Sequence, residues 1–377
     1  MASLRQQVSS GDFGGYEAVE DGRYWRAESM KCIIVNQNEA GQRLDKLLGK
    51  YLNLAGKSFL YKMLRKKNIT LNGKKCTGSE KLTQGDEIRL FLSDETIEKF
   101  SRVSVQKVHK VKLSILYEDD HILLVNKPSG MLSQKARDTD ESLVEYIIDY
   151  LLDSGSLTRE ELRSFRPSVC NRLDRNTSGL VAAGKSLAGL QLLSEMFRDR
   201  SLHKYYLCVV AGNLDKGQII DGYLKKDART NQVTIHKSQI PDSGRIQTEY
   251  EPLCCQDGFT LLKVTLVTGR THQIRAHLAS VGHPVAGDYK YGDPAVNEQV
   301  KKLYKIHSQM LHSWKLVFPQ MAEPLAHIGG QSFTAPAPEE FVQMFPEIFP
   351  TDSGTAEREE AQEASRAMSG SYKEVTP

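Results

Sequence analysis

The run from Asn171 to Gly179, Asn-Arg-Leu-Asp-Arg-Asn-Thr-Ser-Gly, has the strongest potential for chemistry in this chain. It places Asp174 between Arg172 and Arg175. Nearby positive charge favours the ionised form of a carboxylate, and an ionised aspartate can act as a nucleophile. The same residue types are common in turns, so the run by itself fits an aspartate that caps a loop equally well.

Two later segments strengthen the chemical interpretation. The first is Lys-Tyr-Tyr-Leu-Cys-Val-Val from 204 to 210, and the second is Gly-Arg-Thr-His-Gln-Ile-Arg-Ala-His from 269 to 277, followed by Gly-His-Pro-Val-Ala-Gly-Asp from 282 to 288. Together with the Asp174 run, these segments resemble, in the same order, the motifs of the RluA family of RNA pseudouridine synthases. The resemblance covers residues 113 to 320. Family members often have His where this chain has Asn171, a difference that leaves the carboxylate intact.

The resemblance assigns roles to three residues. It implies that Asp174 is the catalytic carboxylate, that Tyr206 packs against the uracil and takes part in proton transfer, and that Arg275 pairs with the aspartate through a forked hydrogen bond. Pseudouridine formation breaks the bond from ribose to N1 of uracil and joins the ribose to C5, so nothing is oxidised or lost. No cofactor and no metal are therefore expected. Attack on the ribose, attack on the base, and loss of the base through a ribose glycal all stay open.

A uridine inside folded RNA must be flipped out of its stack to reach such a site. We expect Arg172, Arg270, His272 and Gln273 to contact the RNA around the flipped base. Arg270 and His272 fit a second interpretation equally well, in which they fix the loop before a helix.

Basic residues are concentrated near the N-terminus. Residues 31 to 112 carry 18 Lys and Arg against 8 Asp and Glu, a net charge of +10, whereas the whole chain carries +3. Apolar spacing predicts a helix from Leu44 to Tyr51, and Ser58 is expected to cap a second helix through Arg65. Strands are expected around an Asn-Gly turn at 72–73 and at 85–92. This layout resembles an S4-like RNA-binding domain. Its expected RNA contacts lie at the end of the second helix: Lys62, Arg65, Lys66 and Lys67.

Helical and strand-like segments without a repeated strand-helix-strand rhythm predict an α+β fold with a mixed sheet. We expect a disordered extension at 1–29, the S4-like domain at 30–93, a linker at 94–112, the catalytic domain at 113–350 and a disordered tail at 351–377. Met30 opens a plausible strand, so a translation start at Met30 is an alternative to one at Met1.

The sequence disfavours membrane and secreted proteins. It has no apolar run of about 18 residues, the length that a membrane-spanning helix needs. Its N-terminus lacks the pattern of a secretory signal, and its 6 cysteines have neither metal-site spacing nor a dense disulfide pattern. We therefore expect a soluble cytoplasmic monomer that makes no membrane contact.

Two motifs are expected to be misleading. Residues 179–186 match the phosphate-loop string Gly-x-x-x-x-Gly-Lys-Ser, but a polar turn precedes them and Leu-Val-Ala-Ala resembles a strand, so no nucleotide cofactor is expected. The histidines at 272, 277 and 283 match no zinc signature.

The resemblance therefore implies an RNA pseudouridine synthase. Large-subunit ribosomal RNA is the favoured substrate, because the S4-like module joined to this catalytic domain resembles that branch of the family. A transfer-RNA pseudouridine synthase and a ribosome assembly factor that acts mainly by binding RNA are the alternatives. A methyltransferase is less favoured, because no glycine-rich loop for a methyl donor is evident.

Overall fold

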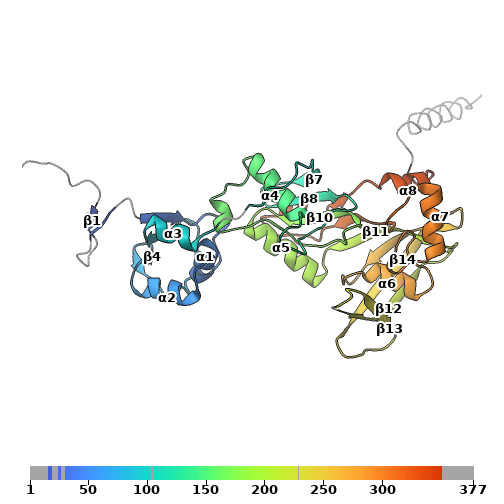
Figure 1. Cartoon of the computed structure of the whole chain (residues 1–377), viewed down its shortest axis with the longest axis horizontal. Coiled ribbons are helices and arrows are strands. Elements are labelled where there is room, and N and C mark those ends of the chain that lie inside the picture. The colour runs from blue at the N-terminus through green and yellow to red at the C-terminus, as the bar shows by residue number, and fades with distance from the viewer. Residues whose placement is uncertain (1–15, 19–23, 27–29, 103–104, 228, 350–377) are drawn as a thin grey trace, which may run out of the picture. The chain divides into compact units, whose positions relative to one another are not determined.

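The computed structural model describes residues 16–18, 24–26, 30–102, 105–227 and 229–349 (Figure 1). The chain divides into two compact units. The small unit comprises Met1–Lys107 and Ile148–Arg166, and the large unit comprises Val108–Ile147 and Pro167–Pro377. No helix in these described ranges is long and apolar enough to cross a membrane.

The two chain ends were predicted to be disordered. Within residues 1–29 the structure describes two short strands, β1 (Tyr16–Ala18) and β2 (Tyr24–Arg26), which pair antiparallel. The rest of that range, and residues 351–377, lie outside the described residues. Disorder at these positions stays a prediction.

A four-stranded sheet in the order β3-β6-β4-β5 forms the small unit together with short helices. Its elements are β3 (Met30–Ile34), α1 (Leu44–Tyr51), α2 (Lys57–Arg65), β4 (Ile69–Leu71), β5 (Lys74–Lys75), β6 (Glu87–Phe91), α3 (Asp94–Phe100) and the 3-10 helix η2 (Glu161–Arg163). The predicted apolar face of α1 is buried. Asn72 and Gly73 both have positive φ, 51° and 71°, which is the geometry expected of an Asn-Gly hairpin.

Two details of the small unit differ from the prediction. Helix α2 begins at Lys57 after Gly56 and has no side-chain cap, so the expected cap by Ser58 is wrong. Residues 94–100, placed in a linker by the sequence, form α3, because Ser93 accepts a hydrogen bond from Thr96 N and caps the helix. Ile97 of α3 is buried in the core of this unit.

A segment from later in the sequence also belongs to the small unit. Residues 148–166 belong to it, and Tyr51 donates a hydrogen bond of 2.9 Å to Glu160 of that segment. The domain boundaries proposed from the sequence stay predictions.

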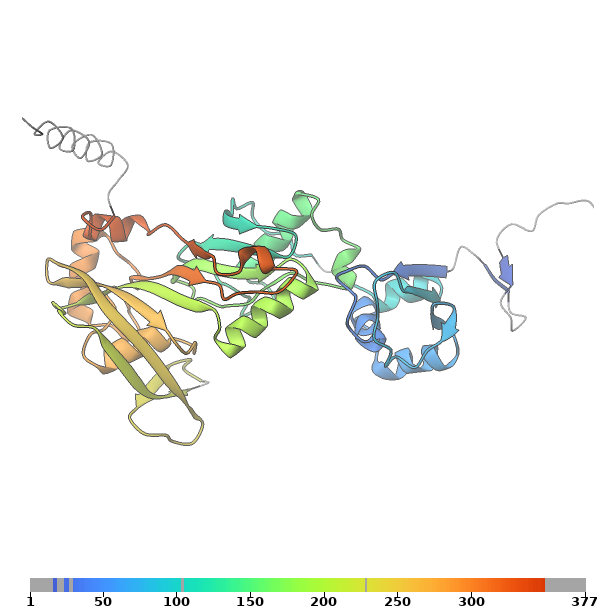
Figure 2. The same cartoon turned by 180° about the vertical axis from the view of Figure 1, so that it is seen from behind.

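The large unit is built on an 11-stranded sheet in the described residues, with the path β13-β12-β14-β15-β11-β16-β10-β8-β7 and side branches β17 and β9 (Figure 2). Its strands are β7 (Ser114–Glu118), β8 (Ile122–Lys127), β9 (Ser168–Val169), β10 (Ser178–Gly184), β11 (His203–Ala211), β12 (Gln218–Lys226), β13 (Val233–His236), β14 (Ser243–Gln256), β15 (Phe259–Leu266), β16 (Leu311–Val317) and β17 (Ser332–Thr334). β10 runs parallel to β16 and antiparallel to β8, so the predicted mixed sheet and α+β class are confirmed.

Helices cover different parts of this sheet. They are α5 (Leu187–Asp199), α6 (Gln273–Ser280), α7 (Pro294–Tyr304), η3 (Ala326–Ile328) and α8 (Glu339–Met344). Helix α4 (Leu143–Asp153) belongs to this unit up to Ile147, and its residues from Ile148 onward belong to the small unit. α5 packs on β8, β10 and β16 through Leu193 and Met196. α7 and α8 pack on β11 and β15 through Val300 and Phe341. α6 packs on β12, β13 and β14 through Ala276, at one end of the sheet (Figure 1).

An irregular pairing of β11 with β16 aligns Tyr206, Ser313 and Gly179 across three neighbouring strands. The β11–β16 register shifts between Tyr205 and Tyr206, so Tyr205 faces Lys315 and Tyr206 faces Ser313. On its other side Ser313 faces Gly179 of β10. Gly179 has a φ of 106°, and a side chain there would overlap the Ser313 backbone, so this position requires glycine.

Candidate active site

Asp174 lies in the loop between β9 and β10, and local hydrogen bonds shape this loop. Thr177 N donates to the Asp174 carbonyl at 3.0 Å, which closes a tight turn. Asn171 holds the loop to β10: its Nδ2 donates to Leu180 O at 3.1 Å, and its Oδ1 accepts from Ala182 N at 2.8 Å. The asparagine that departs from the usual family residue therefore has a clear structural role.

Lys127 also holds this loop in place, and the sequence did not point to it. Lys127, at the end of β8, is fully buried, and its Nζ donates to the carbonyls of Pro128, Met131 and Arg175 at 2.9, 2.9 and 3.0 Å. The three acceptors match the three N–H donors of an ammonium group. Burial lowers the pKa of Lys127 to about 7, against the opposing effect of the Asp174 carboxylate. An available signal was a lysine followed by a proline soon after the apolar run Ile-Leu-Leu-Val at 122–125.

The Asp174 carboxylate is 23% exposed and is held by Arg275. Arg275 Nη1 donates to Asp174 Oδ2 at 2.6 Å. The other edge of the guanidinium forms a bidentate hydrogen bond with a second carboxylate: Nε and Nη2 each donate to Asp288 at 2.7 Å. The predicted pairing of Arg275 with Asp174 is therefore present, but the forked hydrogen bond goes to Asp288. A fork of this kind fixes the plane of the guanidinium.

Asp288 is the second residue that sequence reasoning missed. It is 0% exposed, and it also accepts hydrogen bonds from the backbone N–H groups of Lys290 and Tyr291. These contacts, above all those with Arg275, hold the pKa of the Asp288 carboxyl below its usual value against the effect of burial. Asp288 ends the third sequence motif, but nothing in the sequence indicated that it faces Arg275.

His272 lies beside the same carboxylate. Its Nε2 is 3.8 Å from Asp174 Oδ1, and its Nδ1 is 2.9 Å from the Tyr291 hydroxyl. Burial lowers the pKa of His272, against the opposing effect of the Asp174 carboxylate. Its backbone is left-handed, with a φ of 55°, at the start of α6. His272 therefore both borders the site and fixes the loop before the helix.

Tyr206 is 6% exposed and lies on β11 next to the bulge described above. Burial raises the pKa of Tyr206 to about 12, and the Asp174 carboxylate adds to this rise while the Ser313 hydroxyl opposes it. The phenol is therefore protonated at neutral pH. In that form it can donate a proton or a hydrogen bond, and it is a poor general base.

The residues expected to contact RNA divide into two groups. Arg172 and Arg270 are exposed, and the guanidinium of Arg270 packs over Gly244. Gln273 is a correction. It is 2% exposed, its amide nitrogen donates to Gln247 O and Thr248 Oγ1, and its amide oxygen accepts from Thr268 Oγ1 and Arg270 N. With all these groups engaged, Gln273 holds the start of α6 and cannot contact RNA.

In the small unit, the four basic residues predicted to bind RNA are exposed at the end of α2 and just after it: Lys62, Arg65, Lys66 and Lys67.

Comparison with known proteins identifies the family. Residues 121–280 match the RNA pseudouridylate synthase family, and residues 42–88 match the S4 domain. The Escherichia coli K12 protein named ribosomal large subunit pseudouridine synthase C is 32% identical over 285 residues, which cover 72% of this chain and 83% of the relative. The chain belongs to the RluA family of RNA pseudouridine synthases. A Vibrio cholerae protein of the same name is 30% identical over 301 residues, which cover 77% of this chain and 89% of the relative.

Membership of the RluA family makes this chain an RNA pseudouridine synthase, which is an isomerase. Among solved structures, human RNA pseudouridylate synthase domain containing 4 aligns with a TM-score of 0.49 and 19% identity, over 62% of this chain and 91% of that chain.

Proposed function

We propose that this enzyme converts specific uridines of large-subunit ribosomal RNA to pseudouridine, with Asp174 as the catalytic carboxylate. The observation that carries the proposal is the position of Asp174: it is partly exposed, and Arg275 binds one of its oxygens at 2.6 Å. The other oxygen is left to face the substrate. The choice of RNA follows the names of the E. coli and V. cholerae relatives.

Arg275 keeps Asp174 oriented during the reaction. A guanidinium does not lose its proton at physiological pH, and its fork to Asp288 leaves one N–H for Asp174. Orientation of this kind contributes to catalysis because the carboxylate meets the substrate without rearranging. Attack on ribose, attack on the base and the glycal route all use the same oriented carboxylate.

Tyr206 contacts the uracil ring and exchanges a proton with it. The reaction breaks the bond between N1 and C1′, forms a bond between C5 and C1′, removes a proton from C5 and returns one to N1. A phenol whose pKa is about 12 is protonated before the reaction, so it suits the donor side of this exchange.

RNA binding uses both units. The target uridine is flipped into the site. Arg172, Arg270 and His272 contact the RNA around it, and the exposed Lys62, Arg65, Lys66 and Lys67 supply electrostatic affinity from the S4 domain. No cofactor takes part, and the enzyme acts as a monomer in the cytoplasm, where free thiols such as its 6 cysteines persist.

A pseudouridine map of total RNA tests this proposal. Cells that lack the gene are complemented with wild type or with Asp174→Asn, which removes the ionisable group at nearly constant shape. We expect ribosomal sites to disappear in the deletion strain and to return only with wild type. Loss of transfer-RNA sites would favour the transfer-RNA alternative. Restoration by Asp174→Asn would show that Asp174 is not the catalytic carboxylate. If no site changes in the deletion strain and no other enzyme modifies the same sites, the assembly-factor alternative is favoured.

A further inference from the structure

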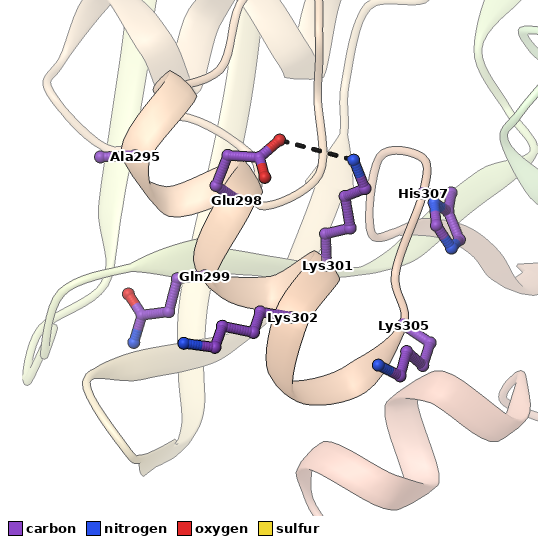
Figure 3. A pocket seen from close by; sticks show the side chains of 7 residues that line it. All are labelled: Ala295, Glu298, Gln299, Lys301, Lys302, Lys305 and His307. Carbon is purple, nitrogen blue, oxygen red and sulfur yellow. Dashed lines mark ion pairs between the residues drawn. The ribbon is translucent and has the colours of Figure 1, made fainter.

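Helix α7 and the turn after it form a basic groove whose residues have no role in the site described above. Its ionisable lining residues are Glu298, Lys301, Lys302, Lys305 and His307, and we call it the α7 groove (Figure 3). The groove holds about 660 Å³ and is open to solvent. An open groove suits an extended chain better than an enclosed small molecule.

Positive charge dominates this groove. Glu298 forms an ion pair of 3.6 Å with Lys301, and Figure 3 shows the amino groups of Lys302 and Lys305 extending away from that pair. Within the part of the chain that the structure describes, no ion pair joins Lys302 or Lys305 to a carboxylate. The ammonium groups of Lys302 and Lys305, with no ion-pair partner among the described residues, favour a polyanionic ligand.

The helix that carries these lysines is firmly positioned. Asp293 caps its start by accepting hydrogen bonds from Ala295 N and Val296 N, and Val300 is fully buried. Asn297 Nδ2 donates to the Asp288 carbonyl at 3.0 Å, which ties the helix to the loop that orients Arg275. The groove is therefore presented on a rigid element joined to the active site.

Lysines in the last turn of a helix are favourable for the helix dipole alone, which accounts for Lys301 and Lys302. It does not account for Lys305. This residue lies past the last turn with a left-handed backbone, φ 59°, where glycine is the usual and less strained residue. The left-handed backbone makes lysine less favourable than glycine at this position, and a contact made by the Lys305 side chain with a ligand would offset this strain.

The turn that follows Lys305 leads directly to the catalytic loop. The Ser308 hydroxyl is 3.3 Å from the Ser129 hydroxyl, which donates to the Asn176 carbonyl at 3.0 Å. Gln309 Nε2 donates to Thr177 Oγ1 at 3.3 Å. Asn176 and Thr177 are two and three residues after Asp174. The turn that ends the groove is therefore hydrogen-bonded to the loop that carries Asp174, so a ligand in the groove would lie on the segment that supports this loop.

We propose that the α7 groove binds the sugar-phosphate backbone of the RNA substrate next to the target uridine. This inference rests on the proposed function, because it takes RNA as the substrate. Contacts to phosphates position an RNA without reading its sequence. Another pocket, of about 360 Å³ beside Arg175, is lined by Asp140 and Glu141 and is less suited to phosphates.

Two matched pairs of substitutions test the proposal in the full-length enzyme. The groove pair is a double variant that carries both Lys302→Gln and Lys305→Gln. The control pair is a double variant that carries both Lys216→Gln and Lys237→Gln, and it removes the same charge from exposed positions outside the groove. Pseudouridine formation is measured on a transcribed fragment of large-subunit ribosomal RNA. For the groove pair we expect KM to rise about tenfold at physiological salt, and the slope of log affinity against log salt to fall by about 1.4 to 1.8. We expect kcat at saturating RNA to stay unchanged, and the control pair to resemble wild type.

Lys305→Gly separates a role in RNA binding from a role in the fold. Glycine relieves the left-handed backbone, so we expect the Tm to rise while RNA affinity falls about threefold to fivefold. A rise in Tm without loss of affinity would make Lys305 a structural residue only and would overturn its assignment.

The outcomes distinguish this inference from the proposed function. If wild type forms no pseudouridine in ribosomal RNA, the proposed function fails. If wild type is active and both pairs have the same KM and salt slope, only the groove inference fails. If the groove pair acts normally on naked RNA but loses modification in cells, the groove meets a protein and the RNA assignment is wrong.

Discussion

At the scale of single residues, the site is a row of two carboxylates joined by one guanidinium. Asp288 uses both of its oxygens on Arg275 and is fully buried, whereas Asp174 uses one oxygen and stays partly exposed. Similar carboxylates thus have different surroundings: the buried one orients the arginine, and the partly exposed one is the carboxylate that we propose for catalysis.

Asp288→Asn tests this division. The amide replaces one acceptor oxygen with an NH₂ group that faces the guanidinium, so Arg275 loses half of its fork. We expect the free energy of unfolding to fall by about 3 kcal/mol. We also expect kcat to fall about 10²-fold through misplacement of Arg275, with little change in KM for RNA. Chemical unfolding and steady-state kinetics measure these effects.

Asp293→Asn is a matched control for that substitution. It removes the same charge five residues later, but Asp293 caps α7, and asparagine is an equally good cap. Wild-type stability and kcat are expected. If Asp288→Asn also keeps the wild-type kcat, Asp288 does not position the catalytic residues.

Lys127 predicts a pH dependence of stability. The pKa of Lys127 is about 7 in the folded chain, below its ordinary value of 10.5, so between these values the unfolded chain binds the extra proton. The contribution of Lys127 to stability is therefore lowest below pH 7 and rises with pH, by at most about 1.4 kcal/mol per unit. The difference in free energy of unfolding between wild type and Lys127→Met should follow this rise from pH 6.5 to 8.5. Parallel curves would contradict it.

At the scale of elements, the site depends on how β10, β11 and β16 meet. The Asp174 loop leads into β10, whose Gly179 faces Ser313 of β16, and Ser313 faces Tyr206 of β11. Only residues distant in sequence create this alignment, and the close approach at Gly179 allows no side chain.

Gly179→Ala should therefore be more harmful than an ordinary glycine substitution. Gly179 and Gly212 both have left-handed φ, 106° and 93°, but an added side chain would meet the Ser313 backbone at Gly179 and open space at Gly212. For Gly212→Ala we expect a loss of about 1 kcal/mol from backbone strain alone. For Gly179→Ala we expect about 3 kcal/mol, because overpacking adds to the strain. Equal losses in thermal unfolding would show that the β10–β16 contact adjusts freely.

The sequence allowed most elements to be predicted, because their signals are local. The helix at Leu44–Tyr51, the Asn-Gly hairpin and the strand expected at 85–92, which is β6, all follow from periodicity or turn chemistry. Burial and long-range pairing are not local signals. For this reason Gln273 was expected among the residues that contact RNA, although its amide is used inside the protein.

The candidate site shows the same limit. Motif resemblance pointed to Asp174, Tyr206 and Arg275, and their side chains gather in the structure. It did not point to Lys127 or Asp288, because a lysine beneath a loop and a carboxylate behind an arginine depend on three-dimensional contacts.

At the scale of the whole molecule, charge and chemistry are divided between the parts of the chain. The S4 domain carries exposed basic residues at the end of α2, and the large unit carries Asp174, the proposed catalytic carboxylate. Phosphate contacts made far from the reacting base add to substrate and transition-state binding alike, so they change KM more than kcat.

Lys62→Gln with Lys66→Gln tests the contribution of the S4 domain. Loss of two phosphate contacts should reduce the salt slope of RNA binding by about 1.4 to 1.8 and should weaken binding to all RNA sequences to a similar extent. Filter binding at several salt concentrations measures both effects. A salt slope equal to that of wild type would show that this helix end does not meet RNA.

The irregular pairing of β11 with β16 has a consequence for the evolution of related chains. β16 holds one additional residue, Trp314, between the partners of Tyr205 and Tyr206. A bulge sets two residues of one strand against one position of the other, so a one-codon deletion of Trp314 would leave a regular ladder in which Lys315 and Ser313 still face Tyr205 and Tyr206. Every residue of the three motifs would survive and Tyr206 would keep its neighbour, but the local bend and added twist of the bulge would be lost. An alignment gap at Trp314 would therefore mark a relative whose β16 is straighter beside Tyr206 even where its motifs are complete.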